Sequence, residues 1–297
     1  MAGMRWLLMC IMALTGILQS EAQTVPKLFM GASPSSEITL EKCSAAGVPG
    51  LARVFDIVPR VSDLQSSCFI VSNQSERTII GIGVQWTIVD SSGKKINRPF
   101  KTHSYLAQNF APLAAPHQRL IVMPAMFIQE PELQSNSGLI VSSPGRQFIS
   151  LFSNAAQVHA EIDSIIFGDG EVAGPNALRL HAEIQARKDA ADVVVRHVHA
   201  SAAVFLRSSG QMPSEPPAFA QHVHEFVKQI DGQLSPDHPI AGALHQLSEP
   251  SANDLVTERA GRFAQDLLHT RHFRGVFELI QSIPSPPVFY RKDGQKL

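Results

Sequence analysis

Histidine is the residue type whose number and spacing most suggest chemistry in this chain. The sequence contains 12 histidines, and nine of them follow residue 173. Imidazole titrates near neutral pH and is a common zinc ligand, so grouped histidines can transfer protons or hold a metal. Their spacing decides between these roles and an ordinary place at the surface or partly in the core.

Two His-x-His pairs, at 197–199 and 222–224, lie in segments that we predict to be helical. Residues two apart on a helix point about 200° apart, so neither pair could hold one metal ion. His269 and His272 are three apart and could share a helix face. They are the candidate metal ligands, although no HExxH motif is present to indicate a zincin-type hydrolase. We expect most of the histidines to be surface or partly buried residues.

A glycine-rich segment at 168–174 (GDGEVAG) follows a predicted strand and precedes a predicted helix. Its spacing is formally close to a dinucleotide-binding loop, but Asp169 and Glu171 would repel a pyrophosphate. We also expect no second strand that would complete a βαβ unit. A calcium loop would need more oxygen ligands than these two carboxylates supply. We therefore predict a tight Asp-Gly turn, a short returning strand and the start of a helix.

An export signal is predicted at residues 1–22. Arg5 precedes an apolar run from Trp6 to Leu18, and small residues stand three positions and one position before a cleavage site after Ala22. The run is too short to span a bilayer, which takes about 20 residues. We expect the mature protein to be periplasmic or secreted.

Removal of the signal would leave two cysteines, Cys43 and Cys68. Two thiols in an oxidising compartment most simply form one disulfide bond. A redox-active pair usually has Cys-x-x-Cys spacing, which is absent here, and two cysteines are too few for a cysteine-ligated zinc site. We predict a structural disulfide.

Charge and motif content exclude several classes of function. The net charge is −1, with 11 basic and 12 acidic residues at 23–172 and 13 of each at 173–297, so neither half has the basic excess typical of nucleic-acid binding. No segment after the signal is apolar enough to cross a membrane. Gly-x-Ser-x-Gly and P-loop motifs are absent, and no cofactor is implied.

The first half of the chain has the period-two pattern of strands. Large apolar residues occupy the even positions of the segment 78–90 (TIIGIGVQWTIVD), with small or polar residues between them. We predict that this strand forms a hairpin with 68–71. Many short strands at this spacing predict an antiparallel, immunoglobulin-like β-sandwich. The other predicted strands are 28–31, 53–58, 119–128, 146–152 and 158–167.

A resemblance supports this interpretation. The stretch CFIVSNQSERTIIGIGVQWTIVDSSGKKI resembles exported bacterial β-sandwich modules of the FxLYD type, in which a strand ends in Asn-x-Ser and a long strand closes at Asp-x-x-Gly. The similarity rests on Asn73, Ser75, Trp86, Asp90 and Gly93, and covers about 30 of the 297 residues. The segment at 163–176 is also similar to segments of uncharacterised secreted bacterial proteins. The resemblance implies a fold rather than an activity.

The apolar period changes to that of helices after Gly174-Pro175-Asn176. We predict helices at 177–207, 217–231 and 239–247, and a longer one from Ser251 with a break near 271–272. The expected domains are a signal peptide (1–22), a β-sandwich (23–173), a helical region (174–283) and an extended tail (284–297). The overall class is α+β.

These features favour an exported, non-enzymatic protein that acts in binding or in envelope assembly, with a protein or envelope component as its partner. The alternative is a metal-dependent hydrolase that uses histidines of the helical half.

Overall fold

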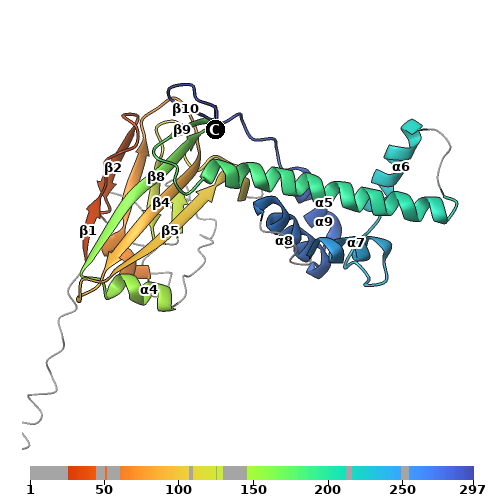
Figure 1. The fold of residues 1–297 in the computed structure, drawn as a ribbon, viewed down its shortest axis with the longest axis horizontal. Coiled ribbons are helices and arrows are strands. Elements are labelled where there is room, and N and C mark those ends of the chain that lie inside the picture. The colour runs from red at the N-terminus through yellow and green to blue at the C-terminus, as the bar shows by residue number, and fades with distance from the viewer. Residues whose placement is uncertain are drawn as a thin grey trace, which may run out of the picture. The chain divides into compact units, whose positions relative to one another are not determined.

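The chain has an α+β fold with two β-sheets and several helices (Figure 1). The predicted signal and the strand predicted at 53–58 lie outside the residues that the computed structural model describes. Those residues are 26–44, 51, 61–106, 110–124, 126–129, 146–211, 216–248 and 254–297.

The chain forms two compact units that each combine distant parts of the sequence. The first consists of residues 1–74, 84–100 and 117–162, and the second of residues 75–83, 101–116 and 163–297. The second unit therefore joins the helical half to three short segments that precede residue 174.

The smaller sheet has four strands in the order β2-β3-β6-β7, and every neighbouring pair is antiparallel. The run 119–128, which the pattern predicted as one strand, is a hairpin of two. Pro124 lies between its strands, where a residue without an N–H group interrupts a ladder. The strands are β2 (Ile38–Lys42), β3 (Phe69–Asn73), β6 (Arg119–Met123) and β7 (Met126–Gln129).

The larger sheet has the strand order β10-β9-β8-β4-β5, with β1 also paired to β8. Two of its pairs, β1 with β8 and β9 with β10, are parallel. Parallel neighbours need a long crossover connection, and both pairs join segments that are more than 100 residues apart in sequence. The strands are β1 (Lys27–Met30), β4 (Ile79–Val89), β5 (Lys95–His103), β8 (Gln157–Phe167), β9 (Glu171–Ala173) and β10 (Tyr290–Arg291).

Two predictions for the first half are wrong. The segments 68–71 and 78–90 do not form a hairpin, because β3 belongs to the smaller sheet and β4 to the larger one. Turn-forming residues between two strands do not determine which sheet each strand joins. The segment 146–152 is a helix, α4 (Arg146–Ser153), and not a strand. Its Ile149 and Phe152, three apart, are both buried, which is helical spacing.

The long strand β4 confirms the predicted alternation within the first unit. Val84, Trp86 and Ile88 are at most 1% exposed, and the residues between them are partly exposed. The ring of Trp86 lies 5.7 Å from Phe69 of β3 and 5.7 Å from Phe152 of α4. The indole of Trp86 on β4 therefore packs in the core against side chains of both β3 and α4.

A turn closes β4 as its sequence predicts. The Asp90 carboxylate accepts a hydrogen bond from the Ser92 hydroxyl at 2.6 Å, and two more from the N–H groups of Ser92 and Lys94 at 2.9 and 3.0 Å. These bonds, the hydroxyl bond foremost, lower the pKa of Asp90. Gly93 has a φ of +84°, which favours glycine.

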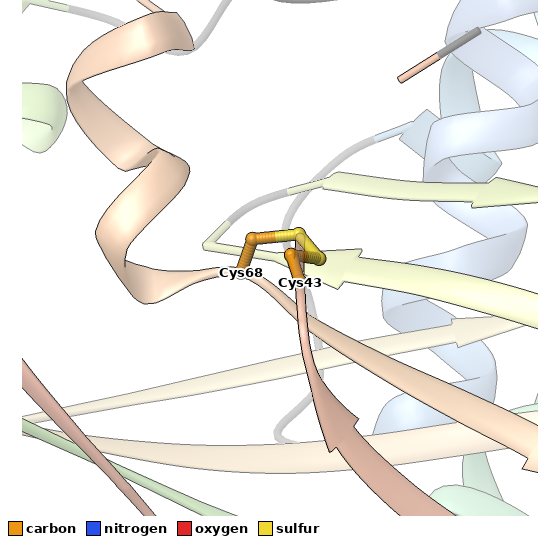
Figure 2. Close-up of a disulfide and its surroundings, with 2 residues drawn as sticks. All are labelled: Cys43 and Cys68. Carbon is orange, nitrogen blue, oxygen red and sulfur yellow. A yellow bond between two sulfur atoms is a disulfide. The ribbon is translucent and has the colours of Figure 1, made fainter. Parts of the chain in front are cut away.

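The predicted disulfide between Cys43 and Cys68 is present (Figure 2). Cys43 follows β2 and Cys68 precedes β3, so the bond links neighbouring antiparallel strands at one end, where Cys43 N–H also donates to the Cys68 carbonyl at 3.1 Å. Together they close the loop between the strands.

The helices of the second unit pack around the long helix α5 (Leu180–Ser208), the green helix of Figure 1. Their number and approximate bounds follow the predicted pattern, including the break near 271–272. No helix in the described ranges is long and apolar enough to cross a membrane. The other helices are α6 (Pro216–Lys228), α7 (Pro239–Ser248), α8 (Leu255–His269) and α9 (Phe273–Gln281).

We expect Cys43 and Cys68 to resist alkylation in protein isolated without a reductant, until a reductant is added. Replacing both by serine should lower the free energy of unfolding by about 3 kcal/mol, because the closed loop of 25 residues no longer restricts the unfolded chain. Urea unfolding of the oxidised protein and of the double variant measures the difference. Two thiols that react without reduction would contradict the bond.

Candidate ligand-binding pocket

A pocket of about 860 Å³ lies in the second unit. Its walls come from the start of α5, the start of α8 and the segment 286–297, with Lys101 of β5 at one side. This volume is typical of sites that hold small molecules, which range from about 300 to 1,000 Å³. The pocket is therefore the candidate functional site of the described chain.

The first wall of the pocket depends on how α5 begins. The Asp163 carboxylate on β8 accepts hydrogen bonds from the backbone N–H groups of Ala177 and Leu178, at 2.7 and 3.1 Å. Its carbonyl accepts a third, from Asn176 N–H at 2.9 Å. Asp163 is 6% exposed, so these bonds are made away from solvent. Three bonds to one residue fix the segment that leads into the helix.

The segment that leads into α5 contains two residues with positive φ, Asn176 (54°) and Arg179 (53°). The helix begins at Leu180, five residues after Pro175, and so later than the predicted first turn at 177. Arg179 at the N-cap makes no side-chain capping bond, but Asn176 Oδ1 accepts from Leu180 N–H at 3.1 Å. Asn176 therefore takes the capping role from outside the usual position.

Asn176 also holds a histidine of the pocket wall. Its Nδ2 lies 2.6 Å from Nδ1 of His181. The imidazole ring also lies near Phe289, with 6.0 Å between the two ring centroids. Burial, together with the charges of Arg179 and Arg291, lowers the pKa of His181 below its ordinary value. His181 is therefore a neutral, positioned side chain at neutral pH.

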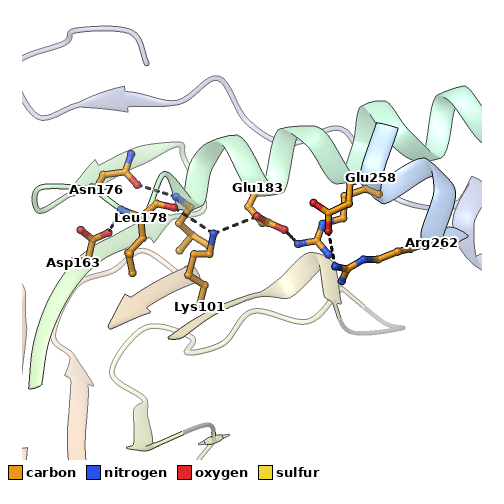
Figure 3. Close-up of polar contacts among 9 residues, drawn as sticks. Lys101, Asp163, Asn176, Leu178, Glu183, Glu258 and Arg262 are labelled. Carbon is orange, nitrogen blue, oxygen red and sulfur yellow. Dashed lines mark hydrogen bonds and ion pairs between the residues drawn. The ribbon is translucent and has the colours of Figure 1, made fainter. Parts of the chain in front are cut away.

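A carboxylate between two cations stabilises the pocket side of α5 (Figure 3). Glu183, which is 8% exposed, accepts from Lys101 Nζ at 3.3 Å and forms an ion pair with Arg259 of α8. Lys101 also donates to the Leu178 carbonyl at 3.3 Å. Burial, followed by the Arg259 charge, lowers the pKa of Lys101. Glu183 thus ties together α5, α8 and β5.

The segment 286–297 forms another wall and is anchored on the glycine-rich turn. Tyr290 N–H donates to the Gly170 carbonyl at 3.1 Å, and β10 continues this contact as a parallel strand beside β9. Gly170 has a φ of +97°, and a Cβ at this position would lie 2.1 Å from the Val288 carbonyl oxygen. Phe289 is 6% exposed. The predicted extended tail is therefore a packed part of the pocket.

The segment 168–174 forms the predicted turn and short strand. Gly170 and Gly174 have positive φ, and β9 returns beside β8 in antiparallel register. The Asp169 and Glu171 carboxylates bind Arg77 Nη1, at 3.1 and 2.9 Å. Arg77 also stacks on the Phe167 ring at 3.8 Å. These carboxylates are thus partners of an arginine in a structural turn.

The histidines that the spacing singled out do not come together at a metal site. His269 and His272 are both exposed, and α8 ends at His269, so helical spacing does not relate them. His269 Nδ1 bonds the Gln265 carbonyl at 2.8 Å. No group of three or more His, Cys, Asp or Glu side chains that could hold a metal occurs among the described residues.

The two His-x-His pairs behave as helical geometry requires. His197 and His222 are exposed, whereas His199 and His224 turn inward, and their ring centroids lie 6.3 Å apart. A third aromatic ring, Phe277 of α9, is 5.8 Å from His199. This inward pair joins α5 to α6 within the helical core.

His103 is a buried titratable group that the sequence pattern did not single out. It is 3% exposed, and its Nδ1 has no hydrogen-bond partner in the described part of the chain. Burial lowers its pKa to about 3, and the charges of Arg187, Arg259 and Lys101 add to the effect. Only its place at the end of a strand, two residues after Lys101, distinguishes it in the sequence.

Sequence reasoning also missed the pocket residues Asn176, His181 and Glu183. Lys101 and Glu183 are 82 positions apart, and no local spacing connects them. Asn176 and His181 carry a weak local signal, since an asparagine before a helix is a frequent cap.

No family model, curated protein or solved structure matches this chain.

We expect Glu183→Gln to lower the free energy of unfolding by roughly 2–3 kcal/mol, because Lys101 and Arg259 would lose the carboxylate that they share. The partly exposed cations keep the loss below that of a fully buried pair. The matched control is Glu258→Gln, which removes an exposed ion pair with Arg262 one turn along α8 and should cost less than about 1 kcal/mol. Equal losses in urea unfolding would contradict the assigned role of Glu183.

His103 should make the protein less stable as the pH falls from about 6.5 to about 3. In this range the unfolded chain binds a proton that the folded chain does not, so stability rises with pH, with a slope approaching about 1.4 kcal/mol per unit. Urea unfolding at pH 6.5, 5.5 and 4.5 should show a shallower dependence for His103→Gln than for the parent chain. Parallel curves would mean that His103 is not held neutral.

Proposed function

We propose that the chain is an exported, non-enzymatic binding protein whose ligand occupies the pocket between α5, α8 and the segment 286–297. The observation that carries the proposal is the pocket itself, which has the volume of a small-molecule site and polar groups held in place by hydrogen bonds and ion pairs to neighbouring residues. Such preformed sites, mostly apolar with a few fixed polar groups, are typical of ligand-binding proteins.

The composition of the pocket walls supports binding of a small molecule. Val256, Pro287 and Phe289 offer apolar surface, and His181 and Glu183 contribute polar groups. Asn176 positions His181, and Arg259 and Lys101 position Glu183. Because these polar groups are fixed before a ligand arrives, binding would lose little free energy in ordering them.

We further infer that the first unit is an immunoglobulin-like β-sandwich that engages a protein or envelope partner. The contact between Phe69 and Trp86 supports packing of the smaller sheet against the larger one. The stacked rings of Phe100 on β5 and Phe127 on β7, 4.9 Å apart, support the same arrangement. We infer a protein or envelope partner because the sequence resembles exported β-sandwich modules.

Export to the periplasm or the exterior remains part of the proposal. It is based on the signal predicted at 1–22 and is supported by the disulfide, since such bonds persist mainly in oxidising compartments.

The pocket can be tested with N-phenyl-1-naphthylamine, a neutral dye that fluoresces in apolar sites. We expect saturable binding of one dye per chain. Ala182→Trp should weaken it by about tenfold or more, because Ala182 lines the pocket and an indole would fill it. Fluorescence titration gives both dissociation constants.

Ala200→Trp is the matched control, since Ala200 is exposed on the same helix and does not line the pocket. Its dye affinity should equal that of the parent chain. Circular dichroism verifies that each variant is folded. Absence of saturable binding by the parent chain, or equal binding by Ala182→Trp, would contradict the proposed site.

A further inference from the structure

The acidic residues that line the pocket have partners within the protein, whereas one of its basic residues forms no ion pair with the described residues. Its acidic residues are engaged within the protein: Glu183 binds Lys101 and Arg259, Asp189 accepts from Gln185 at 3.0 Å, and Asp254 caps α8 through Thr257 N–H at 2.9 Å. The charge of Glu183 is therefore balanced by two cations, and the Asp254 carboxylate is engaged by a backbone N–H group.

The arginine at the start of α5 has no such partner. Arg179 lines the pocket, is exposed, and forms no ion pair with any residue in the described ranges. A second cation, Arg291 of β10, lies close enough for its charge, like that of Arg179, to act on His181. Two arginines therefore contribute positive charge at this end of the pocket.

His181 adds a hydrogen-bond donor at the same end. Asn176 Oδ1 accepts from Leu180 N–H, so Nδ2 is the atom that donates to His181 Nδ1 at 2.6 Å. An imidazole whose Nδ1 accepts carries its proton on Nε2. Asn176 thus selects the tautomer in which Nε2–H is a donor, and no described residue forms a hydrogen bond with Nε2.

Apolar side chains line the same pocket. The ring centroid of Phe289 lies 6.0 Å from that of His181, and Val256 and Leu255 of α8 are also part of the lining. A ligand that satisfies the donors at one end would place an apolar body along these side chains, which would remove apolar area from water.

We propose that the pocket takes a small amphipathic anion, whose oxyanion head group binds Arg179 and His181 Nε2–H and whose apolar body lies against Phe289 and Val256. This inference rests on the proposed function and adds the chemical class of the ligand. Arg179 supplies a charge-assisted bond, and its planar guanidinium suits a carboxylate, sulfonate or phosphate.

Two dyes distinguish the contribution of the head group to binding from that of the apolar body. 8-Anilinonaphthalene-1-sulfonate has the aromatic body of N-phenyl-1-naphthylamine and carries in addition one sulfonate. We expect the parent chain to bind the anionic dye about fivefold or more tightly than the neutral one, and Arg179→Asn to abolish this preference. Asparagine tolerates the positive φ of this position, so the backbone should persist.

Arg179→Lys keeps the charge and should retain most of the preference. Arg196→Gln removes an exposed cation on the same helix outside the pocket, and should leave both affinities unchanged. His181→Gln should reduce the affinity for the anionic dye more than that for the neutral dye.

The outcomes distinguish this inference from the proposed function. Binding of both dyes with equal affinity, or a preference that survives in Arg179→Asn, would overturn the anionic ligand class and leave the binding pocket in place. Failure of the parent chain to bind either dye would overturn both. A preference lost in Arg179→Asn and kept in Arg179→Lys and Arg196→Gln would support the inference.

Discussion

The backbone hydrogen bonds that Asp163 accepts are the constraint on which the candidate site depends. Three N–H groups at 176–178 donate to this one residue, which is nearly buried on β8. They fix the direction in which the chain leaves the sheet and enters α5. The angular positions of Arg179, His181 and Glu183 on the first turns of the helix follow from that start.

Gly81 on β4 allows the helix to begin so close to the sheet. A Cβ at this position would come within 3.1 Å of Leu180 and 3.4 Å of Ile184, both on α5. Glycine in a strand weakens it, but here it admits the first turn of α5. A glycine also permits close packing at position 170, where the absence of a side chain lets the Val288 carbonyl approach the backbone.

Local sequence pattern predicted much of the architecture. This pattern shows the alternation around Trp86, the breaks between helices and the turn at 168–174. Each of these features depends on residues that are close together in the sequence. It was wrong for 146–152, where a short apolar run suits either a strand or a helix. It was also wrong for the hairpin from 68 to 90, because a turn does not specify which sheet the following strand enters.

The sequence by itself determined the α+β class, the pairing of Cys43 with Cys68 and the approximate bounds of the helices, since periodicity and composition act locally. Only the tertiary structure decided that Lys101, Glu183 and Arg259 meet, that β10 lies beside β9, and that the segment 286–297 closes a pocket over α5. These contacts join residues 76 to 119 positions apart. Their formation depends on how the elements pack, and no spacing along the chain encodes it.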